Sequence, residues 1–425
     1  MHFIQNLQLV SVVLDVHPLS ERHTADYLRE TITKVQKSWN ISNSKVVCIV
    51  TDGGANIVKA SNDLFGELRH LHCFAHMLNF IPQRAISNVP KLVLLIKKVK
   101  QIVTFFKHSI TAADMLTKCQ HGGCILKLKQ EVPTRWNTTY YMMERFKILA
   151  PKISSVLLEI PNGPEMVSTA ELNDIKDLLH LLQPFEIVTK EVFGQEYITS
   201  SKVIPLVHTL ENKVGNLEAT TEIGQKLQIK LKKEIEKRFQ KIEFIQLLSI
   251  ATLIDPRFKT IHFQKPLAKS NVLQIVNKEI RQMISAENVY VSNSRLNSEE
   301  NVNDNLVDNN SDIWNYHKKV KYLASSQILE SSNSTMEAEF KQYLYLPLIN
   351  INNDVLAVWE SYKTVFPHLY VVAQKYLSTV SSSIPSERLF SKAGNLITEK
   401  RNRISESRIS KLCFLQTIPA MYWDL

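Results

Sequence analysis

Apolar and β-branched residues are concentrated in three short segments near the start of the chain. They are residues 7–16, 45–52 and 68–73. Runs of this length and composition predict buried strands. Apolar positions at helical spacing predict a helix from His23 to Trp39, with Thr24 as its N-cap, and a short helix over residues 58–65. Alternating strands and helices favour a mixed α/β sheet.

From about His76 the pattern changes to apolar residues at helical spacing. It recurs in segments 92–106, 172–185, 227–242 and 355–377, without convincing hairpins between them. A large all-helical region is therefore expected. Residues 226–241 carry six lysines and one arginine beside an apolar stripe of Leu227, Leu231, Ile235 and Phe239. We favour a solvated face over a packed stripe rather than a DNA-binding groove.

Two polar segments interrupt the helical region. Residues 292–312 consist mainly of Asn, Ser, Glu and Asp, and residues 325–335 are a weaker case of the same composition. Segments with so few apolar residues cannot bury enough surface to offset the entropy of ordering. Both are expected to be disordered loops.

Composition and charge narrow the class of protein. With 44% hydrophobic and 22% charged residues, the 425-residue chain has the composition of an ordinary globular protein, and its length allows about three domains. The net charge of +10 indicates either an anionic partner, most simply nucleic acid, or merely a cationic surface. Charge alone does not decide between these two.

Cysteine use and apolar run length indicate the compartment. Five scattered cysteines give no disulfide framework and fit a reducing environment. The first residues lack the basic region of a signal peptide, and the longest apolar runs, such as residues 92–96, are too short to span a bilayer. We expect a soluble intracellular protein, without a membrane partner or a small-molecule substrate.

Five short blocks resemble the hAT superfamily of transposases and the host proteins domesticated from them. The C-terminal block SERLFSKAG, residues 386–394, is followed by KRNRI at 400–404. The others, in order, are TDGGAN (51–56), CFAH (73–76), TRWN (134–137) and LIDPRFK (253–259). Each block alone is weak, but all five follow the order of the family. The chain is similar to the zinc finger BED members of this group, and the nucleus is the implied location.

The resemblance implies an α/β fold: an incomplete RNase H-like domain interrupted by a large all-helical insertion, with a hAT C-terminal dimerisation region. Residues 1–76 would form the first part of the RNase H-like domain, with its opening strand missing. Residues 77–365 would form the insertion. Residues 366–425 would form the dimerisation region and complete the RNase H-like domain.

The implied chemistry needs three carboxylates around two divalent metal ions about 3.5–4 Å apart. The resemblance assigns the second carboxylate to Asp52 and the third to Glu387. The family's first aspartate precedes a segment resembling residues 1–4, so we expect an N-terminally truncated chain with a vestigial site and no bound metal. Mg²⁺ or Mn²⁺ would be the cofactor if the site were active. On their own, Asp52 is a turn residue before Gly-Gly, and Glu387 complements a helix dipole.

Four residues are implied to contact DNA. Arg135 would bind a phosphate, Trp136 would stack on an unpaired base, and Cys73 and His76 would support the active-site wall and the DNA end. Stacking on an aromatic side chain contributes about 1–3 kcal/mol per base. A tryptophan at the start of a helix is equally consistent with core packing.

A zinc site is a further alternative for the cysteines. Cys119, His121 and Cys124 stand close together in the sequence, and Cys73 with His76 would complete a set of ligands. These groups come from distant segments, whereas a structural zinc site needs a closed four-ligand geometry. We favour ordinary cysteines.

The C-terminal region is implied to mediate association of this chain with itself or with a related chain. The apolar residues assigned to that surface are Leu369, Val372, Tyr376, Leu412, Phe414 and Leu415. Some of them will also serve the intramolecular core.

The function that follows is that of a domesticated or decayed hAT transposase-like protein, without catalytic activity, which acts in the nucleus through dimerisation and has some affinity for DNA. One alternative is an active transposase whose first catalytic aspartate and BED zinc finger lie upstream of this sequence. A DNA-binding regulator acting through basic helices is a third interpretation.

Overall fold

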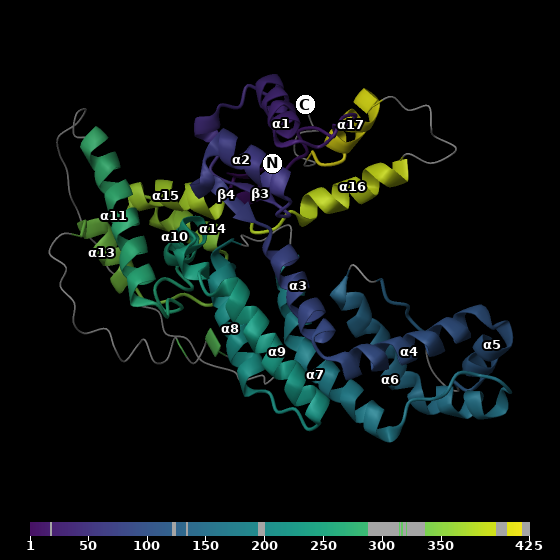
Figure 1. Ribbon diagram of the computed structural model, residues 1–425. Coiled ribbons are helices and arrows are strands. Elements are labelled where there is room, and N and C mark those ends of the chain that lie inside the picture. Colours follow the sequence, from purple (N-terminus) through teal and green to yellow (C-terminus); the bar gives the residue numbers. More distant parts are fainter. Residues whose placement is uncertain are drawn as a thin grey trace. The chain divides into compact units, whose positions relative to one another are not determined.

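A computed structural model describes residues 1–17, 19–120, 125–132, 135–193, 200–287, 314, 316–317, 320, 336–396 and 406–418 (Figure 1). The chain divides into two compact units. The first contains Met1–Ala75, Val192–Thr209 and Lys241–Leu425, and the second contains His76–Glu191 and Leu210–Gln240. The polar segments 292–312 and 325–335 lie outside the described residues.

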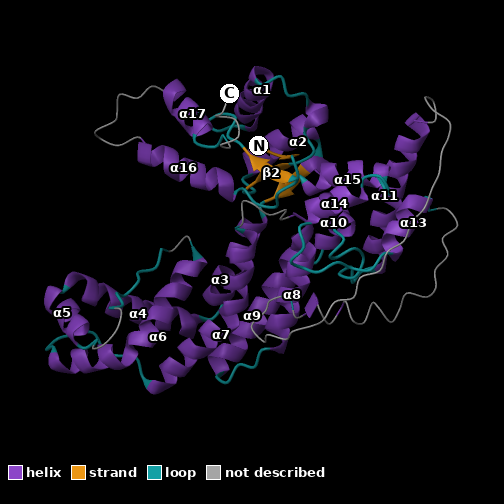
Figure 2. Ribbon diagram, turned by 180° about the vertical axis from the view of Figure 1, so that it is seen from behind, coloured by secondary structure: helices purple, strands orange, loops and turns teal. Residues whose placement is uncertain are grey.

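The strands of the first unit form two separate pairs. Strands β1 (His2–Gln5) and β2 (Gln8–Ser11) form an antiparallel hairpin, whereas β3 (Ile49–Thr51) and β4 (His70–His72) pair in parallel, with Thr51 opposite His72 (Figure 2). The described chain is mostly helical, so the predicted α/β sheet is present only as these short pairs. An RNase H-like fold is not established by them.

The predicted strand over residues 7–16 is wrong beyond Ser11, for a reason that lies far along the chain. The amide of Val13 donates to the hydroxyl of Thr417 (3.0 Å), and the amide of Val16 lies 3.4 Å from the hydroxyl oxygen of Ser410. Amides bonded to the side chains of residues 410 and 417 are not available for a strand ladder. The predicted strand at 45–52 is likewise shortened, because residues 43–45 form a 3₁₀ turn.

Helices make up the rest of the first unit. They are α1 (Ala25–Ser38), α2 (Ala55–Phe65), α10 (Gln246–Ile254), α11 (Pro266–Glu287), α13 (Ala338–Tyr345), α14 (Val355–Tyr362), α15 (Pro367–Leu377), α16 (Ile384–Leu396) and α17 (Glu406–Leu415). The 3₁₀ turns are η1 (Asn43–Lys45), η2 (Glu67–Arg69), η3 (Ser200–Lys202) and η4 (Ile242–Phe244). The N-cap prediction for α1 is confirmed, because the Thr24 side chain accepts a hydrogen bond from the Tyr27 amide (3.3 Å).

The carboxyl end of α10 is the centre of the first unit's core. Residues 247–254 are all buried, and the last turn's carbonyl groups are bonded by side chains of other helices. The Tyr343 hydroxyl donates to the Ile254 carbonyl (2.7 Å), as does the Trp359 indole (3.1 Å). Two large aromatic residues of α13 and α14 thus satisfy carbonyl groups that a helix end leaves unpaired.

The LIDPRFK block forms a buried ionic cap on this helix end. The carboxylate of Asp255, which is fully buried, accepts from the Ser201 hydroxyl (2.7 Å), the Arg257 amide (3.0 Å) and the Arg257 guanidinium (2.6 Å). The Lys259 ammonium donates to the carbonyl groups of Tyr343 and Leu346. A carboxylate with this many donors offsets the cost of its burial.

The second unit is built from long helices. It contains α4 (Pro90–His108), α5 (Ile110–Lys118), α6 (Trp136–Glu159), α9 (Glu222–Phe239) and nearly all of α7 (Thr169–Val192). Helices α3 (Phe74–Ser87) and α8 (Val203–Asn216) begin in the first unit and continue into the second. The four apolar side chains of the lysine-rich helix α9 are buried, as the interpretation of a packed stripe expects.

The units differ in part from the predicted domains. The predicted boundary after residue 76 lies beside the boundary between the units, but the segment 241–365, predicted to belong to the insertion, lies in the first unit. In the ranges that the structure describes, no helix is both long enough and apolar enough to cross a membrane.

A pair of stacked histidines places Trp314 and His317 against Phe258 and His262 of the first unit. The rings of His262 and His317 lie 5.2 Å apart at 15°, with Nε2 of His262 2.9 Å from Nδ1 of His317, and both side chains are buried. Trp314 stacks on Phe258 beside them, with 5.7 Å between ring centroids. Burial, and then His317 and His208, lower the pKa of His262 well below its usual value.

This pair predicts acid sensitivity. A histidine whose pKa is lowered by folding binds more protons when unfolded, so its stabilising contribution is present above pH 6.5 and is lost as the pH falls below it. We expect the free energy of unfolding to fall by up to about 1.4 kcal/mol per pH unit below this point from His262. Urea titrations between pH 7.5 and 5 should show a smaller decrease for His262→Phe. An identical decrease in the variant would assign the acid sensitivity to other groups.

A close contact between α9 and α7 gives a second prediction. A Cβ atom on Gly224 would lie 2.4 Å from a carboxylate oxygen of Asp177, whereas a Cβ on Gly215 would meet nothing within 4 Å. We expect Gly224→Ala to destabilise the chain by about 1–3 kcal/mol. The matched change Gly215→Ala should be neutral or stabilising by up to about 1 kcal/mol. Thermal unfolding of both variants measures the difference, and equal melting temperatures would contradict the contact.

Candidate functional site

Two of the predicted site residues follow the parallel strands directly. Asp52 comes after β3 and Cys73 comes after β4, and the Cys73 amide donates to the Thr51 carbonyl (2.7 Å). Because the strands are parallel, their carboxyl ends lie at one edge, which is where α/β proteins place their ligands. We call this the carboxyl edge.

The C-terminal segment comes to the same edge. The Phe74 amide donates to the Ser381 carbonyl (2.8 Å), and the Ser383 amide donates to the Sγ of Cys73 (3.3 Å). Helix α16 begins at the next residue and carries Glu387 in its first turn; Figure 1 shows this helix starting next to the strands. The segments bearing Asp52 and Glu387 are therefore joined through Cys73, although they lie far apart in the sequence.

Both carboxylates are exposed to solvent. Asp52 Oδ1 accepts from the Gly54 amide (3.1 Å), and Gly53 has a φ of 94°, so Asp52 is also a turn residue. Within the described ranges, no group of three or more His, Cys, Asp or Glu side chains is placed to hold a metal ion. That Asp52 and Glu387 share a metal remains a prediction.

Two histidines of β4 are absent from the predicted site. His70 and His72 stand in β4 with ring centroids 4.8 Å apart, and Nε2 of His70 lies 2.8 Å from the Thr51 hydroxyl. Burial, and then His72, lower the pKa of His70. The His-x-His spacing was a usable signal, because residues two apart in a strand point to the same side.

Of the two roles left open for Trp136, base stacking and core packing, the surroundings of its side chain favour core packing. Its side chain is only 3% exposed and packs edge-on against Tyr140 and Phe185, each with 6.2 Å between ring centroids. An indole covered by its own chain has no free face for a base. Arg135, just before α6, is exposed and remains available to a phosphate.

Cys73 and His76 have different surroundings. Cys73 is buried and its sulfur accepts the Ser383 amide, so it fixes the C-terminal segment at the edge. His76 packs edge-on against Phe80 in the second unit, with 4.6 Å between ring centroids. Of the alternative zinc ligands, Cys119 is half-buried, and His121 and Cys124 lie outside the described residues.

The six residues assigned to dimerisation fall into two groups. Leu369, Val372 and Tyr376 of α15 are buried, so they pack within their own chain rather than face a second copy. Leu412 and Leu415 of α17 are 40% and 41% exposed, and Phe414 is half-buried with its ring 5.2 Å from that of Trp39. Phe390 on α16, which the prediction did not include, is 64% exposed. We call Phe390, Leu412 and Leu415 the C-terminal apolar surface.

Two regions of the chain match the models of known protein families. Residues 339–417 match the hAT family C-terminal dimerisation region, and residues 71–181 match the ZBED1 RNase-like helical domain. The chain is related to the hAT transposases. Its relatives include the human zinc finger BED domain-containing protein 4, which is 26% identical over 418 residues, 97% of this chain and 34% of that protein.

Two further proteins are similar to most of this chain. The putative AC transposase of Zea mays is 22% identical over 92% of this chain and 50% of its own length. The human zinc finger BED domain-containing protein 6 is 24% identical over 87% of this hAT-related chain and 39% of its own length. The chain thus spans half or less of these three curated relatives.

Proposed function

We propose that the chain functions in the nucleus as a hAT-derived association module, which pairs with a second copy through the C-terminal apolar surface. The observation that carries the proposal is the coincidence of two features within residues 339–417. These residues match a dimerisation region, and they expose three large apolar side chains on α16 and α17.

The energetics support a modest interface. Burying an exposed leucine or phenylalanine fully is worth about 1.5–3 kcal/mol, and in a two-fold pair each residue is counted twice. Because Leu412 and Leu415 are already partly covered, each has only part of this amount left to contribute. Two or three such residues per copy therefore support association in the micromolar range.

The self-association prediction uses two exposed leucines. Replacing Leu412 and Leu415 together by aspartate places four charges at the interface of a two-fold pair. We expect the dissociation constant to rise by about 100-fold or more, measured by sedimentation equilibrium or light scattering at micromolar concentration. Far-ultraviolet circular dichroism should stay unchanged, because neither side chain lies in the core.

A matched control separates the interface from general surface charge. Leu68 and Leu267 of the same unit are 71% and 64% exposed and lie outside residues 339–417. Replacing both by aspartate adds the same charge and should leave the mass unchanged. The proposal fails if the unmodified chain is monomeric at these concentrations, or if both pairs of substitutions have equal effects.

We also propose that this 425-residue polypeptide, assayed by itself, does not cleave DNA. Asp52 and Glu387 supply two of the three carboxylates that two-metal chemistry requires. Asp15, at the end of the N-terminal segment, hydrogen bonds to the Val16 amide (2.8 Å) and to the Ser410 hydroxyl, which supports a structural role for it. The rival function is a transposase whose first carboxylate comes from a preceding segment of a longer protein.

The cleavage prediction is tested with supercoiled plasmid and Mg²⁺ or Mn²⁺. We expect no nicking and no strand joining above the level of Asp52→Asn. Nicking that depends on metal and disappears in Asp52→Asn would favour the transposase. Affinity for DNA is measured in the same samples by mobility shift; it should weaken steeply with salt, because the second unit carries 22 Lys and Arg against 15 Asp and Glu.

A further inference from the structure

Residues 125–132 of the second unit, ILKLKQEV, lie between α5 and α6 and belong to neither a helix nor a sheet. The exposure of their side chains alternates from residue 125 to residue 130: Ile125, Lys127 and Lys129 are exposed, and the residues between them are half-buried. A period of two is that of an extended strand with one covered face. We call residues 125–132 the α5–α6 segment.

Side chains that precede and follow the α5–α6 segment hold its two ends. At its start the Leu126 amide donates to Oε1 of Gln120 (2.9 Å), and at its end the Val132 amide donates to the Thr138 hydroxyl (2.8 Å). The segment is therefore held in place before any ligand arrives, which lowers the entropic cost of binding.

The middle of the α5–α6 segment offers unpaired backbone groups. Among the residues that the structure describes, the amides of residues 127–131 donate to no acceptor, and the carbonyl groups of residues 128–131 accept from no donor. The carbonyl group of Lys127 accepts from the guanidinium of Arg145 (3.0 Å). A run of unpaired N–H and C=O groups is an edge to which another strand can pair.

An apolar hollow of about 740 Å³ borders the end of the segment, where seven residues of α4 and Glu131 line it. Val93 is 41% exposed and Phe105 is half-buried, so both have surface left to cover. The Glu131 carboxylate is fixed by the Lys100 ammonium of α4 (2.7 Å). The hollow can thus take an aliphatic side chain from a strand paired with the segment. Strand addition combines backbone pairing with side-chain pockets in this way.

Unpaired cations accompany both features. Lys97 in the hollow and Lys127 and Lys129 on the segment are exposed, and within the described ranges none of them makes an ion pair. The carboxylate of Glu131 is already engaged, since it also accepts from the Thr139 hydroxyl (3.1 Å). The excess charge is therefore positive, and acidic side chains opposite Lys127 and Lys129 would form favourable cross-strand pairs.

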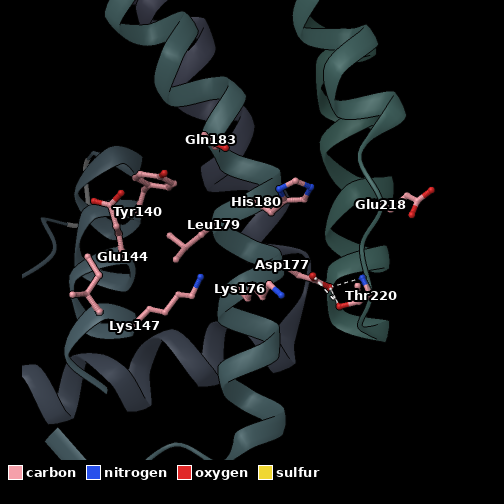
Figure 3. Close-up of a pocket in the computed structure, with 11 residues that line it drawn as sticks. Tyr140, Glu144, Lys147, Lys176, Asp177, Leu179, His180, Gln183, Glu218 and Thr220 are labelled. Atoms are coloured by element: carbon pink, nitrogen blue, oxygen red, sulfur yellow. Dashed lines mark hydrogen bonds between the residues drawn. The ribbon is translucent and has the colours of Figure 1, made fainter. Parts of the chain in front are cut away.

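The hollow across α7 in Figure 3 differs in its charge. Its lining carries three carboxylates against two lysines and a histidine, and the Asp177 carboxylate accepts from the Thr220 amide (2.8 Å). Such a lining does not select an acidic ligand. The α5–α6 segment and its hollow carry the opposite excess.

The unpaired carbonyl groups favour a peptide over a nucleic acid strand. Phosphates would suit the lysines, but phosphate oxygens only accept hydrogen bonds and would leave the carbonyl groups of residues 128–131 without donors. A peptide backbone brings one donor and one acceptor at each residue other than proline. It can therefore satisfy the amides and the carbonyl groups together.

We propose that residues 127–131 bind an extended segment of a partner protein as an added β-strand. Acidic side chains at alternate positions of that segment lie opposite Lys127 and Lys129, and an aliphatic side chain enters the hollow at Val93. This recognition is separate from self-association, because it uses residues of the second unit only.

The partner's sequence pattern is tested by selection from a phage-displayed library of random dodecapeptides on the whole chain, with K127E/K129E for counter-selection. We expect enriched sequences to place Asp or Glu at alternate positions, with Leu, Ile or Val within a few residues. An enriched peptide, synthesised with a fluorescent label, should bind K127E/K129E at least about tenfold more weakly, measured by anisotropy. The control K233E/K237E changes the same charge at exposed lysines of α9 and should bind as the unmodified chain does.

A scan of single N-methyl groups along the enriched peptide tests the backbone pairing itself. Each methyl group removes one amide donor. Because only alternate amides of an added strand face its partner, methylation at every second central position should weaken binding at least about tenfold, and the positions between should change it by less than about twofold.

The hollow is tested at two neighbouring apolar positions of α4. V93D places a charge in the hollow and should weaken binding of the same peptide at least about tenfold. The matched control L94D adds the same charge at a residue that is 66% exposed and outside the hollow, and should leave binding unchanged.

Any of four results would overturn the proposal. The first is no enrichment, or enrichment without acidic residues. The second is equal effects within either pair of protein variants, which would show attraction by net charge alone. The third is a methylation scan without alternation, which would exclude an added strand. The fourth is a 20-nucleotide single strand whose binding is lost in K127E/K129E while binding of the peptide is kept, which would assign the lysines to nucleic acid. Circular dichroism of each variant excludes unfolding as the cause.

Discussion

The fully buried carboxylate of Asp255 is the interaction on which the first unit depends. It joins the Ser201 hydroxyl of η3 to the Arg257 guanidinium just beyond α10. The same helix end receives the side chains of Tyr343 and Trp359, and Lys259 binds two carbonyl groups beyond it. Segments from four separate parts of the chain therefore meet at one place. Removing one partner would leave a buried charge or buried carbonyl groups unsatisfied, which costs more than the bond itself contributes.

The carboxyl edge depends on a second set of long-range bonds. Its strands have only three residues each, too few to be stable by themselves. Cys73 and Phe74 connect them to residues 381–383, so the edge has its geometry only when the C-terminal segment is in place. Any chemistry assigned to Asp52 is therefore inseparable from the region that matches the dimerisation pattern, since both lie on one packed unit.

The sequence predicted the features that depend on interactions between residues close together in the chain. The cap at Thr24 and the stripe on α9 were predictable because neighbouring positions determine them. The end of strand β2 at Ser11 was not predictable, because a residue far along the chain binds an amide that follows the strand. The surroundings of Trp136 were left open for the same reason, because its burial depends on Phe185 of another helix. The order of motifs placed Asp52 and Glu387 in one unit, and the His-x-His spacing of β4 was the signal that could have added His70 and His72 to the predicted site.

The bonds between the N-terminal segment and residues 410 and 417 have a consequence for synthesis of the chain. Val13 and Thr417 are 404 positions apart, and Val16 and Ser410 are 394 apart. At about 5–20 residues per second, a ribosome needs roughly 20–80 s to make the intervening polypeptide. Throughout that time the amides of residues 13 and 16 lack these partners, while the helices of the second unit, whose contacts span shorter stretches, can already pack. These two long-range bonds therefore form only after residues 410–417 have been made, and a chain released before that point would leave both amides without these partners.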